Sequence, residues 1–352
     1  MTRHLTFGNA IHEAMHQAMS RDDSVIAYGL GINDPKAIFG TTAGLEQRFG
    51  KERVFDTPTS ENAMTGVGIG AALNGFRPIM VHQRLDFFLL AMDQLVNSAA
   101  KWHFMFGGER GVPITIRLIL GRGWGQGPTH SQSLQAWFAH IPGLKVVMPT
   151  SAEDAKGLLL SSIFDDNPVL FLEHRWLHNT IGVVPETSYL TPIGKASRVR
   201  EGDMVTIVTM SYMTIEAIHA ADFLVQQGIH CDVIDLRTIR PLDWDMVFAS
   251  VRRSGRLLAL DTGHETGSVA GEILARVSSK CWSDLKSAPQ RIAMPDYPEG
   301  TSPALTKNYH PRAEVIVERV GMMLGKQIDA SPLIRQRLYP NDVPGDWFTG
   351  PF

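Results

Sequence analysis

Short apolar runs rich in Val and Ile alternate along the chain with longer segments whose apolar residues recur at helical spacing. A continuous apolar run of about four to eight residues is typical of a strand that is buried on both faces. Such runs predict strands at 112–120, 144–149, 168–173, 204–211, 231–237 and 256–261. The intervening patterns predict helices at 151–163, 213–227 and about 268–279. This alternation is typical of an α/β fold with parallel sheets that helices cover on both faces.

The alternation stops between about residues 174 and 203, where the sequence is irregular and rich in turn-forming residues. We place the domain boundary there, which gives a first domain at 1–190 and a smaller second domain at 195–325. Residues 326–352 are rich in Pro and have no clear period, so they predict an irregular C-terminal tail on the surface. Two domains suit 352 residues, because domains commonly hold about 100–200 residues.

Charge and cysteine content narrow the class of protein. The chain has 33 Lys and Arg against 36 Asp and Glu, a net charge of -3 that does not favour nucleic acid as a partner. Its two cysteines, Cys231 and Cys281, are far apart and predict neither a disulfide framework nor a zinc site. The sequence has no secretory signal pattern and no apolar run of membrane-spanning length. We therefore expect a cytoplasmic protein that does not bind a membrane.

Two short motifs match known sites without their context. His12, Glu13 and His16 fit the HExxH pattern of zinc proteases, but an amphipathic helix at the start of the chain supplies no third ligand and no cleft. The run GVGIG at 66–70 lacks the G-x-G-x-x-G spacing of a dinucleotide loop and follows no strand. We expect its small residues to allow close packing of a helix instead. Farther along, the apolar segment 89–101 predicts a buried helix.

Two polar segments are better candidates for chemistry. DTPTSEN at 56–62 ends an extended segment and opens a glycine-rich apolar helix, which would leave Glu61 at a helix start with little water around it. GRGWGQGPTHSQS at 121–133 predicts a mobile loop in which four glycines allow the backbone to close over a ligand, and this loop ends near His130. Taken alone, His130 fits equally well a loop histidine that only hydrogen-bonds its neighbours.

Together, these segments resemble the beta subunit of the thiamine-diphosphate-dependent component of 2-oxo-acid dehydrogenases, a family related to transketolase that includes the pyruvate, branched-chain and acetoin enzymes. The similar stretches include RVFDTPTSEN, GIGAALNGFRPI, DFFLLAMDQLVNSAAKW, HSQSLQAWFAHIPGLKVVMPTSAEDAKGLL and CDVIDLRTIRPLD. They follow the family order from about residue 4 to 320. The resemblance implies a pyrimidine-binding domain followed by a transketolase C-terminal-like domain.

The resemblance also implies roles for individual residues. Glu61 matches the glutamate that meets the aminopyrimidine ring of thiamine diphosphate and activates the cofactor by sharing a proton with it. Phe87 matches an aromatic residue that packs against the pyrimidine, and we include Gln83 among the cofactor-binding candidates. His130 matches the catalytic histidine that holds the substrate or donates a proton to it. Asp165 and Asn167 match a region that holds a monovalent cation in some relatives.

The chain lacks the GDG…N segment that would supply ligands to the diphosphate and its Mg²⁺. The Gly-Asp pairs at 202–203 and 345–346 do not fit that segment. Within the family, a separate alpha chain completes the site in an alpha-two beta-two heterotetramer and holds Mg²⁺. The resemblance therefore implies an alpha partner, and this chain is expected to provide no metal ligands and to be inactive alone.

Several departures leave the substrate open. Relatives that act on pyruvate often have Glu where this chain has Val81 and Gln where it has Thr129. Arg84 and Arg122 are candidates for binding a substrate carboxylate or phosphate, with surface or interchain ion pairs as the alternative.

The main functional hypothesis is decarboxylation of a 2-oxo acid such as pyruvate, with acyl transfer to the lipoyl carrier of an acyltransferase core. The first alternative is a thiamine-diphosphate-dependent carboligase or ketol-transferring enzyme of a biosynthetic pathway. In that case the tail at 326–352 would cover the surface that docks the core. The second alternative is a non-catalytic partner chain.

Overall fold

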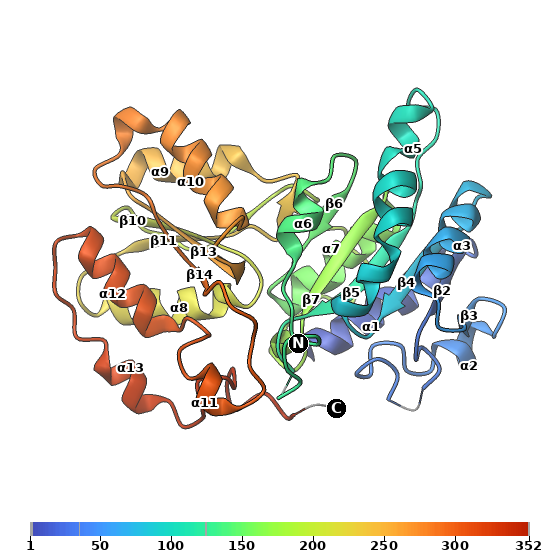
Figure 1. Cartoon of the computed structure of the whole chain (residues 1–352), viewed down its shortest axis with the longest axis horizontal. Coiled ribbons are helices and arrows are strands. Elements are labelled where there is room, and N and C mark those ends of the chain that lie inside the picture. Colours follow the sequence, from blue (N-terminus) through green and yellow to red (C-terminus); the bar gives the residue numbers. More distant parts are fainter. Residues whose placement is uncertain (1–2, 35, 124, 351–352) are drawn as a thin grey trace. The chain divides into compact units, whose positions relative to one another are not determined.

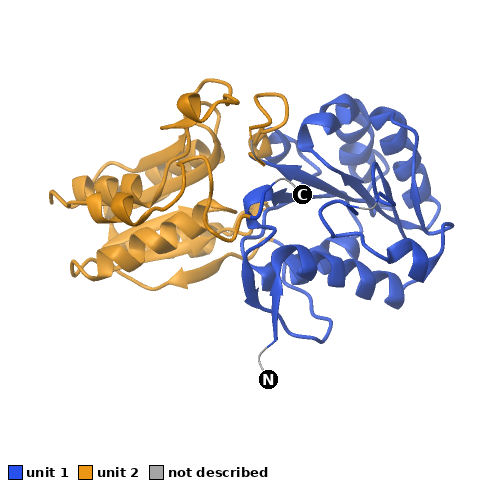
Figure 2. Ribbon diagram, turned by 90° about the horizontal axis from the view of Figure 1, so that it is seen from below, with its two compact units in different colours: residues 1–121, 137–193, 349–352 blue, residues 122–136, 194–348 orange. Residues whose placement is uncertain are grey.

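A computed structural model describes residues 3–34, 36–123 and 125–350 of the chain. The chain divides into two compact units (Figure 2). Unit 1 comprises residues 1–121, 137–193 and 349–352, and unit 2 comprises residues 122–136 and 194–348. The glycine-rich loop that carries His130 thus belongs to unit 2, although residues on both sides of it belong to unit 1. In the part of the chain that the model describes, no helix has the length and apolarity needed to cross a membrane.

Unit 1 contains a parallel sheet with the strand order β6-β7-β5-β4-β2-β3. Its strands are β2 (Val25–Gly29), β3 (Val54–Asp56), β4 (Arg77–His82), β5 (Thr115–Leu120), β6 (Lys145–Val147) and β7 (Val169–His174). Two further strands, β1 (His4–Thr6) and β8 (Ile181–Val183), form an antiparallel pair. All residues of β5 and β7 are buried, as their continuous apolar runs predict.

The helices of unit 1 cover this sheet (Figure 1). They are α1 (Phe7–Arg21), α2 (Leu45–Phe49), α3 (Glu61–Leu73), α4 (Leu85–Phe88), η1 (Leu89–Ala91), η2 (Gln94–Ala99), α5 (Ala100–Met105), α7 (Ala152–Ile163) and η3 (Arg175–Leu177). Helix α6 (Gln135–His140) lies where the chain returns to unit 1. α1 packs against α7 through a buried face that includes Phe7, Ile11 and Met15.

The small residues of α3 have the packing role that the sequence suggests. A Cβ atom on Gly68 would lie 2.1 Å from the hydroxyl oxygen of Tyr28 and 2.8 Å from Cδ1 of Ile114. Only glycine fits at this contact between α3 and the sheet.

The buried helix predicted at 89–101 is wrong in its regularity and in part of its burial. The segment consists of a 3₁₀ turn, a π-helical stretch and the start of α5, and Leu90 is 70% exposed. The segment packs against α3, and Ala91 and Leu95 are buried there.

Unit 2 contains a sheet with the strand order β14-β13-β10-β11-β9, in which only β9 is antiparallel to its neighbour. The strands are β9 (Ser197–Arg200), β10 (Val205–Thr209), β11 (Cys231–Asp235), β13 (Leu257–His264) and β14 (Gln290–Met294), and the chain also forms the short strand β12 (Thr238–Arg240). The two sheets confirm the predicted α/β fold, and all six predicted strands overlap observed ones, which are β5, β6, β7, β10, β11 and β13.

Helices cover both faces of the sheet in unit 2. On one face lie α8 (Met213–Val225) and α12 (Ala313–Met323), and on the other lie α9 (Trp244–Ser254) and α10 (Val269–Lys280) (Figure 1). Shorter helices are η4 (Trp282–Asp284), α11 (Pro303–Thr306) and α13 (Ser331–Gln336). The last of these lies within the C-terminal segment 326–352, for which the sequence shows no periodic pattern. Residues of this segment, including Ala330 and Leu333, pack against the core formed by α8 and α12.

Candidate functional site

Three of the predicted site residues follow the carboxyl ends of two strands in unit 1 that flank the same strand. β3 and β4 flank β2, so that Gly29 pairs with Asp56 on one side and with Val81 on the other. Glu61 begins α3 after β3, whereas Gln83 and Phe87 follow β4. Ligands of parallel sheets bind beyond these strand ends. The topology therefore brings Glu61, Gln83 and Phe87 to one edge of the sheet.

The turn that leads to Glu61 is fixed by hydrogen bonds to the loop after β2. The backbone N–H of Ile32 donates to the Asp56 carboxylate at 2.7 Å, and the backbone N–H of Thr57 donates to the carbonyl of Gly29 at 3.1 Å. The Glu61 side chain is 8% exposed, although Ser60 and Asn62 on either side are exposed. The prediction that Glu61 is shielded from solvent at a helix start is confirmed.

Gln83 and Phe87 occupy the adjoining loop and helix. Gln83 is exposed, and its side-chain nitrogen lies so close to Gly31 that a Cβ atom there would be 2.3 Å away. Gly31 also has φ +76°, a backbone conformation that favours glycine. Both the close approach of the Gln83 amide and this conformation therefore require glycine at position 31. Phe87 is half-buried in α4.

A buried histidine lies at the carboxyl end of β4, next to Gln83. His82, the last residue of β4, is fully buried and packs edge-to-face against Phe88 with ring centroids 5.2 Å apart. Within the described part of the chain, neither ring nitrogen of His82 has a hydrogen-bond partner. Burial lowers the pKa of His82 to about 4, so the ring is neutral near pH 7.

His130 lies on the loop of unit 2 and is half-buried. Its Nδ1 atom lies 3.0 Å from the hydroxyl oxygen of Thr129, and its backbone N–H donates to the carbonyl of Gly127 at 3.3 Å. The structure thus groups Glu61, Gln83 and Phe87 in unit 1 and assigns His130 to unit 2. Residue 124 of the same loop lies outside the described residues.

The two arginines that the sequence offers as substrate contacts are both buried and have protein partners. Arg84 is 3% exposed and donates to the carbonyl of Gly121 at 2.8 Å. Arg122 is also 3% exposed and forms ion pairs with Glu299 and Asp342. Each arginine thus has partners within its own unit, and the expectation that they form surface ion pairs is wrong.

The candidate cation region near Asp165 already has cationic partners. Lys145 forms an ion pair with the Asp165 carboxylate, and Arg77 donates to the carbonyls of Asp165 and Ile163 at 3.0 and 3.3 Å. The backbone N–H of Asn167 donates to the same carboxylate at 2.9 Å. Lys145 therefore neutralises the Asp165 carboxylate, and Arg77 occupies the nearby carbonyl oxygens.

The residues of the HExxH match also have structural partners. Glu13 forms ion pairs with Arg3 and Lys156, and the ring Nε2 of His12 lies 2.7 Å from the carbonyl oxygen of Ala43. The ring of His16 packs against Phe49. Across the described residues, no group of three His, Cys, Asp or Glu side chains is arranged to hold a metal ion.

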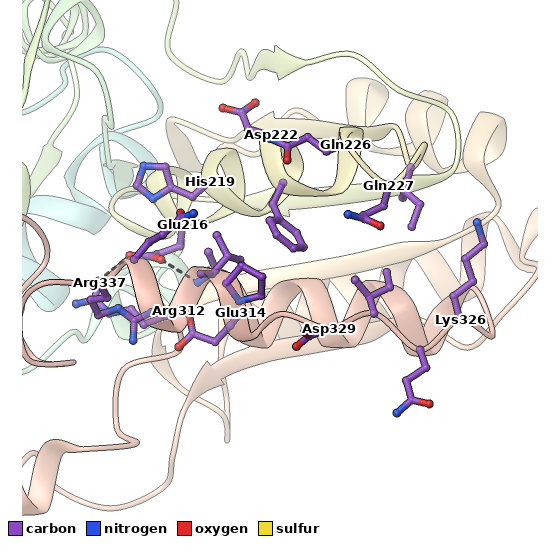
Figure 3. Close-up of a pocket in the computed structure, with 18 of the residues that line it drawn as sticks. Glu216, His219, Asp222, Gln226, Gln227, Arg312, Glu314, Lys326, Asp329 and Arg337 are labelled. Carbon is purple, nitrogen blue, oxygen red and sulfur yellow. Dashed lines mark hydrogen bonds and ion pairs between the residues drawn. The ribbon is translucent and has the colours of Figure 1, made fainter.

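A groove in unit 2 has a volume of about 1040 Å³ and lies between α8, α12 and the C-terminal segment (Figure 3). Charged residues and glutamines dominate its lining, including His219, Gln226, Lys326 and Asp329. Two ion pairs lie along it, Arg312 with Glu216 and Arg337 with Glu314. The pair between Arg337 and Glu314 attaches the C-terminal segment to α12.

Comparison with known proteins defines first the domains and then the family. Residues 3–179 match the transketolase pyrimidine-binding domain, and residues 194–316 match the transketolase C-terminal domain. A solved split gene transketolase, described as an inactive beta4 tetramer, has a TM-score of 0.74 at 20% identity and covers 92% of this chain and 100% of its own. That likeness supports the fold.

Curated relatives are similar over most of their length. The chain is 41% identical to the acetoin:2,6-dichlorophenolindophenol oxidoreductase subunit beta of Cupriavidus necator, over 90% of this chain and 96% of that protein. It is 41% identical to the 2-oxoisovalerate dehydrogenase subunit beta of Bacillus subtilis, over 84% and 90%. It is 40% identical to the mitochondrial pyruvate dehydrogenase E1 component subunit beta-1 of Arabidopsis thaliana, over 90% and 88%. The chain belongs to this family of 2-oxo-acid dehydrogenase beta subunits, which confirms the resemblance seen in the sequence.

Sequence reasoning missed the residues that hold the His130 loop. Gln135 donates to the buried Asp261 at 2.6 Å, and Arg122 pairs with Asp342, which lies 220 positions farther along the chain. The only local signal for the Gln135–Asp261 contact is that Gln135 closely follows the HSQ motif. No local pattern links Arg122 to Asp342.

Proposed function

We propose that this chain is the beta subunit of a thiamine-diphosphate-dependent enzyme that decarboxylates a 2-oxo acid and passes the acyl group to a lipoyl carrier. The observation that carries the proposal is the poorly hydrated Glu61 carboxylate at the carboxyl edge of the sheet in unit 1. The family places a cofactor-activating glutamate at this position of its motif. We include a cytoplasmic location in the proposal, on the sequence argument alone.

The residues at this edge suit the aminopyrimidine half of the cofactor. A carboxylate with little water around it can share a proton with a ring nitrogen, which is the role we assign to Glu61. The half-buried Phe87 would offer its ring to the pyrimidine, and the exposed Gln83 would offer an amide. When bound, thiamine diphosphate supplies the carbon nucleophile and the electron sink that decarboxylation requires. We assign to His130 the positioning of the substrate or the donation of a proton to it.

The diphosphate and Mg²⁺ would be held mainly by an alpha partner in an alpha-two beta-two heterotetramer. Apolar side chains on α3, η1 and α5 support a protein partner, because Val67, Leu90 and Phe104 are 64%, 70% and 88% exposed. α3 packs against η1 and η2, and α5 packs against η2, so these exposed residues lie on connected helices. Exposed apolar groups that gather in this way are typical of protein interfaces.

One observation favours the carboligase alternative, in which an aldehyde and not a lipoyl carrier accepts the acyl group. The C-terminal segment packs over α8 and α12 in the transketolase C-terminal-like domain, the domain that docks the acyltransferase core in the family. If the segment covers the docking surface, the enzyme would act as a carboligase with an aldehyde acceptor. A chain that ends at residue 325 would then bind the core more tightly than the full chain, and unchanged core binding would exclude this role of the segment.

The experiment that tests the main proposal is an assay of the chain co-expressed with its alpha partner. Release of CO₂ from pyruvate and from branched-chain 2-oxo acids is measured with thiamine diphosphate and Mg²⁺, first with lipoamide and then with an aldehyde as acceptor. We expect lipoamide-dependent turnover. Turnover only with aldehyde would support the carboligase, and no turnover with any 2-oxo acid would support the non-catalytic partner chain.

A further inference from the structure

The loop that carries His130 is held at its far end by a buried carboxylate. Gln135 donates from its side-chain amide to Asp261 at 2.6 Å, and Asp261 also accepts from the backbone N–H groups of Gly263 and Ala270 at 2.8 and 3.1 Å. Both Gln135 and Asp261 are fully buried. Because Asp261 lies in β13, this anchor ties the end of the loop to the sheet of unit 2.

The near end is held by Arg122. This guanidinium donates to Glu299 at 2.9 Å and to Asp342 at 2.8 Å, and also to the carbonyls of Gly300 and Thr301 at 2.9 and 3.1 Å. The two carboxylates come from different parts of unit 2 and are 6% and 7% exposed. Arg122 therefore joins three segments of the unit in a site with little water.

Asp342 belongs to the C-terminal segment, and that segment has its own attachments to unit 2. Arg312 donates to the carbonyl of Asn341 at 2.8 Å and to that of Val343, and it pairs with Glu216 of α8 (Figure 3). These bonds hold the backbone on both sides of Asp342. Its carboxylate also accepts from the Thr306 hydroxyl at 3.0 Å. The segment therefore presents Asp342 to Arg122 in a fixed position.

The loop between the two anchors packs closely on unit 2. A Cβ atom on Gly127 would lie 2.7 Å from the Thr301 hydroxyl, and one on Gly125 would lie 3.1 Å from the Thr301 carbonyl oxygen. Arg122 bonds to the same Thr301 carbonyl. Arg122 thus holds Thr301, the residue against which Gly125 and Gly127 pack.

We propose that Asp342 is a positioning residue for His130, so that the C-terminal segment orders the histidine loop through Arg122. The inference rests on the role proposed for His130. Glycines leave a loop with more conformational freedom to lose than other residues do, so its order depends on its anchors. Without Asp342, the buried Arg122 guanidinium would keep Glu299 as a carboxylate partner but lose its link to the C-terminal segment. Small misplacement of a reacting group costs up to about 100-fold in rate.

The test compares two alanine variants in the complex with the alpha partner. Asp342→Ala removes one of the two carboxylate partners of Arg122 and leaves Glu299, whereas Glu314→Ala removes an ion pair of the segment, with Arg337, that does not involve Arg122. Asp342→Asn keeps an acceptor oxygen and serves as the milder variant. For each variant, amide hydrogen exchange is measured over residues 125–131, and kcat and KM are measured for the decarboxylation reaction.

For Asp342→Ala we expect about a 10-fold loss of kcat with little change in the KM for thiamine diphosphate, together with faster exchange in the loop. Asp342→Asn should lie between this variant and the wild type, and Glu314→Ala should match the wild type in both readouts. Wild-type exchange and kcat in Asp342→Ala, or equal losses in both alanine variants, would overturn the inference.

His130→Ala in the same assay separates this failure from that of the proposed function. If His130→Ala is fully active while Asp342→Ala still loosens the loop, the role assigned to His130 is wrong and the inference falls with it. If His130→Ala is inactive and Asp342→Ala keeps full kcat with a loosened loop, only the positioning role is wrong.

Discussion

The regions that hold Glu61 in unit 1 and His130 in unit 2 are held in place by different means. Glu61 follows a strand of the unit 1 sheet, and short-range packing around β2 and β3 fixes its turn. His130 lies on a glycine-rich loop whose order depends on Arg122 and Gln135 and on partners far along the chain. Strand ends place residues through the pairing of the sheet itself, whereas the loop needs dedicated anchors. The second region should therefore be the more sensitive to changes outside the site.

The largest effect is expected at the strand-end region. Glu61→Gln removes the carboxylate to which we assign proton sharing with the cofactor, and it should lower kcat by about 10³-fold, within the usual range for general acid–base catalysis. The measurement is CO₂ release by the complex with the alpha partner. Glu52→Gln, at an exposed position of the same unit, is the control and should keep full activity. Full activity of Glu61→Gln would exclude a chemical role for this residue.

Stability should separate a buried ion pair from an exposed one. Glu173 and Arg117 pair at 2.6 Å with both side chains fully buried. Burial alone would raise the pKa of Glu173, but the Arg117 guanidinium holds it at about 2. Glu173→Ala should lower the free energy of unfolding by about 3 kcal/mol, because it leaves a buried arginine unpaired. Urea denaturation of the chain measures this loss.

The matched control is Glu272→Ala, which breaks an exposed pair with Arg276. It should cost less than about 1 kcal/mol. Equal losses in the two variants would contradict the view that the sheet of unit 1 depends on its buried pair.

His130→Ala tests the loop region directly. If His130 positions the substrate or donates a proton to it, kcat should fall by about 100-fold while the free energy of unfolding stays the same. His140→Ala, at an exposed position of α6, is the matched control. Wild-type kcat in His130→Ala would remove the loop from the catalytic site and leave the strand-end region alone.

The smallest effect concerns pH and His82. Its pKa is lowered in the folded state, so the unfolded chain binds more protons between pH 6.5 and about 4, and stability falls as the pH falls through this window. Between pH 7 and 5 the loss from this residue should be about 2 kcal/mol. Glu173 contributes little between pH 7 and 5, since its lowered pKa makes stability fall mainly as the pH drops below its ordinary value of 4.5.

Urea denaturation at the two pH values measures the His82 effect. His82→Leu should show a smaller difference between pH 7 and 5 than the wild type does. An equal difference in both proteins would show that His82 is not the group responsible.

Much of the fold could be predicted from the sequence, because its strands and helices are decided locally. The apolar runs at 112–120 and 168–173 mark β5 and β7 within a few residues, and the small residues of α3 mark its close contact with the sheet. The burial of Glu61 also follows from a polar turn placed before an apolar helix.

The rest depends on contacts that local pattern does not encode. The assignment of 122–136 to unit 2 rests on side chains such as Arg122, whose partner Asp342 is 220 positions away. The segment 89–101 has an apolar composition that fits a buried helix, and only its packing decides that Leu95 is buried while Leu90 is exposed. The roles of Glu61, Gln83, Phe87 and His130 stay predictions, since they concern a ligand rather than the fold.

The central claim is that this chain supplies only the pyrimidine half of a thiamine diphosphate site. The most direct measurement is calorimetric titration of thiamine diphosphate with Mg²⁺ into the chain alone and into its complex with the alpha partner. We expect binding in the complex and none by the chain alone. Tight binding by the isolated chain would contradict the divided site, and no binding in either sample would contradict the role of Glu61 as a cofactor-binding residue.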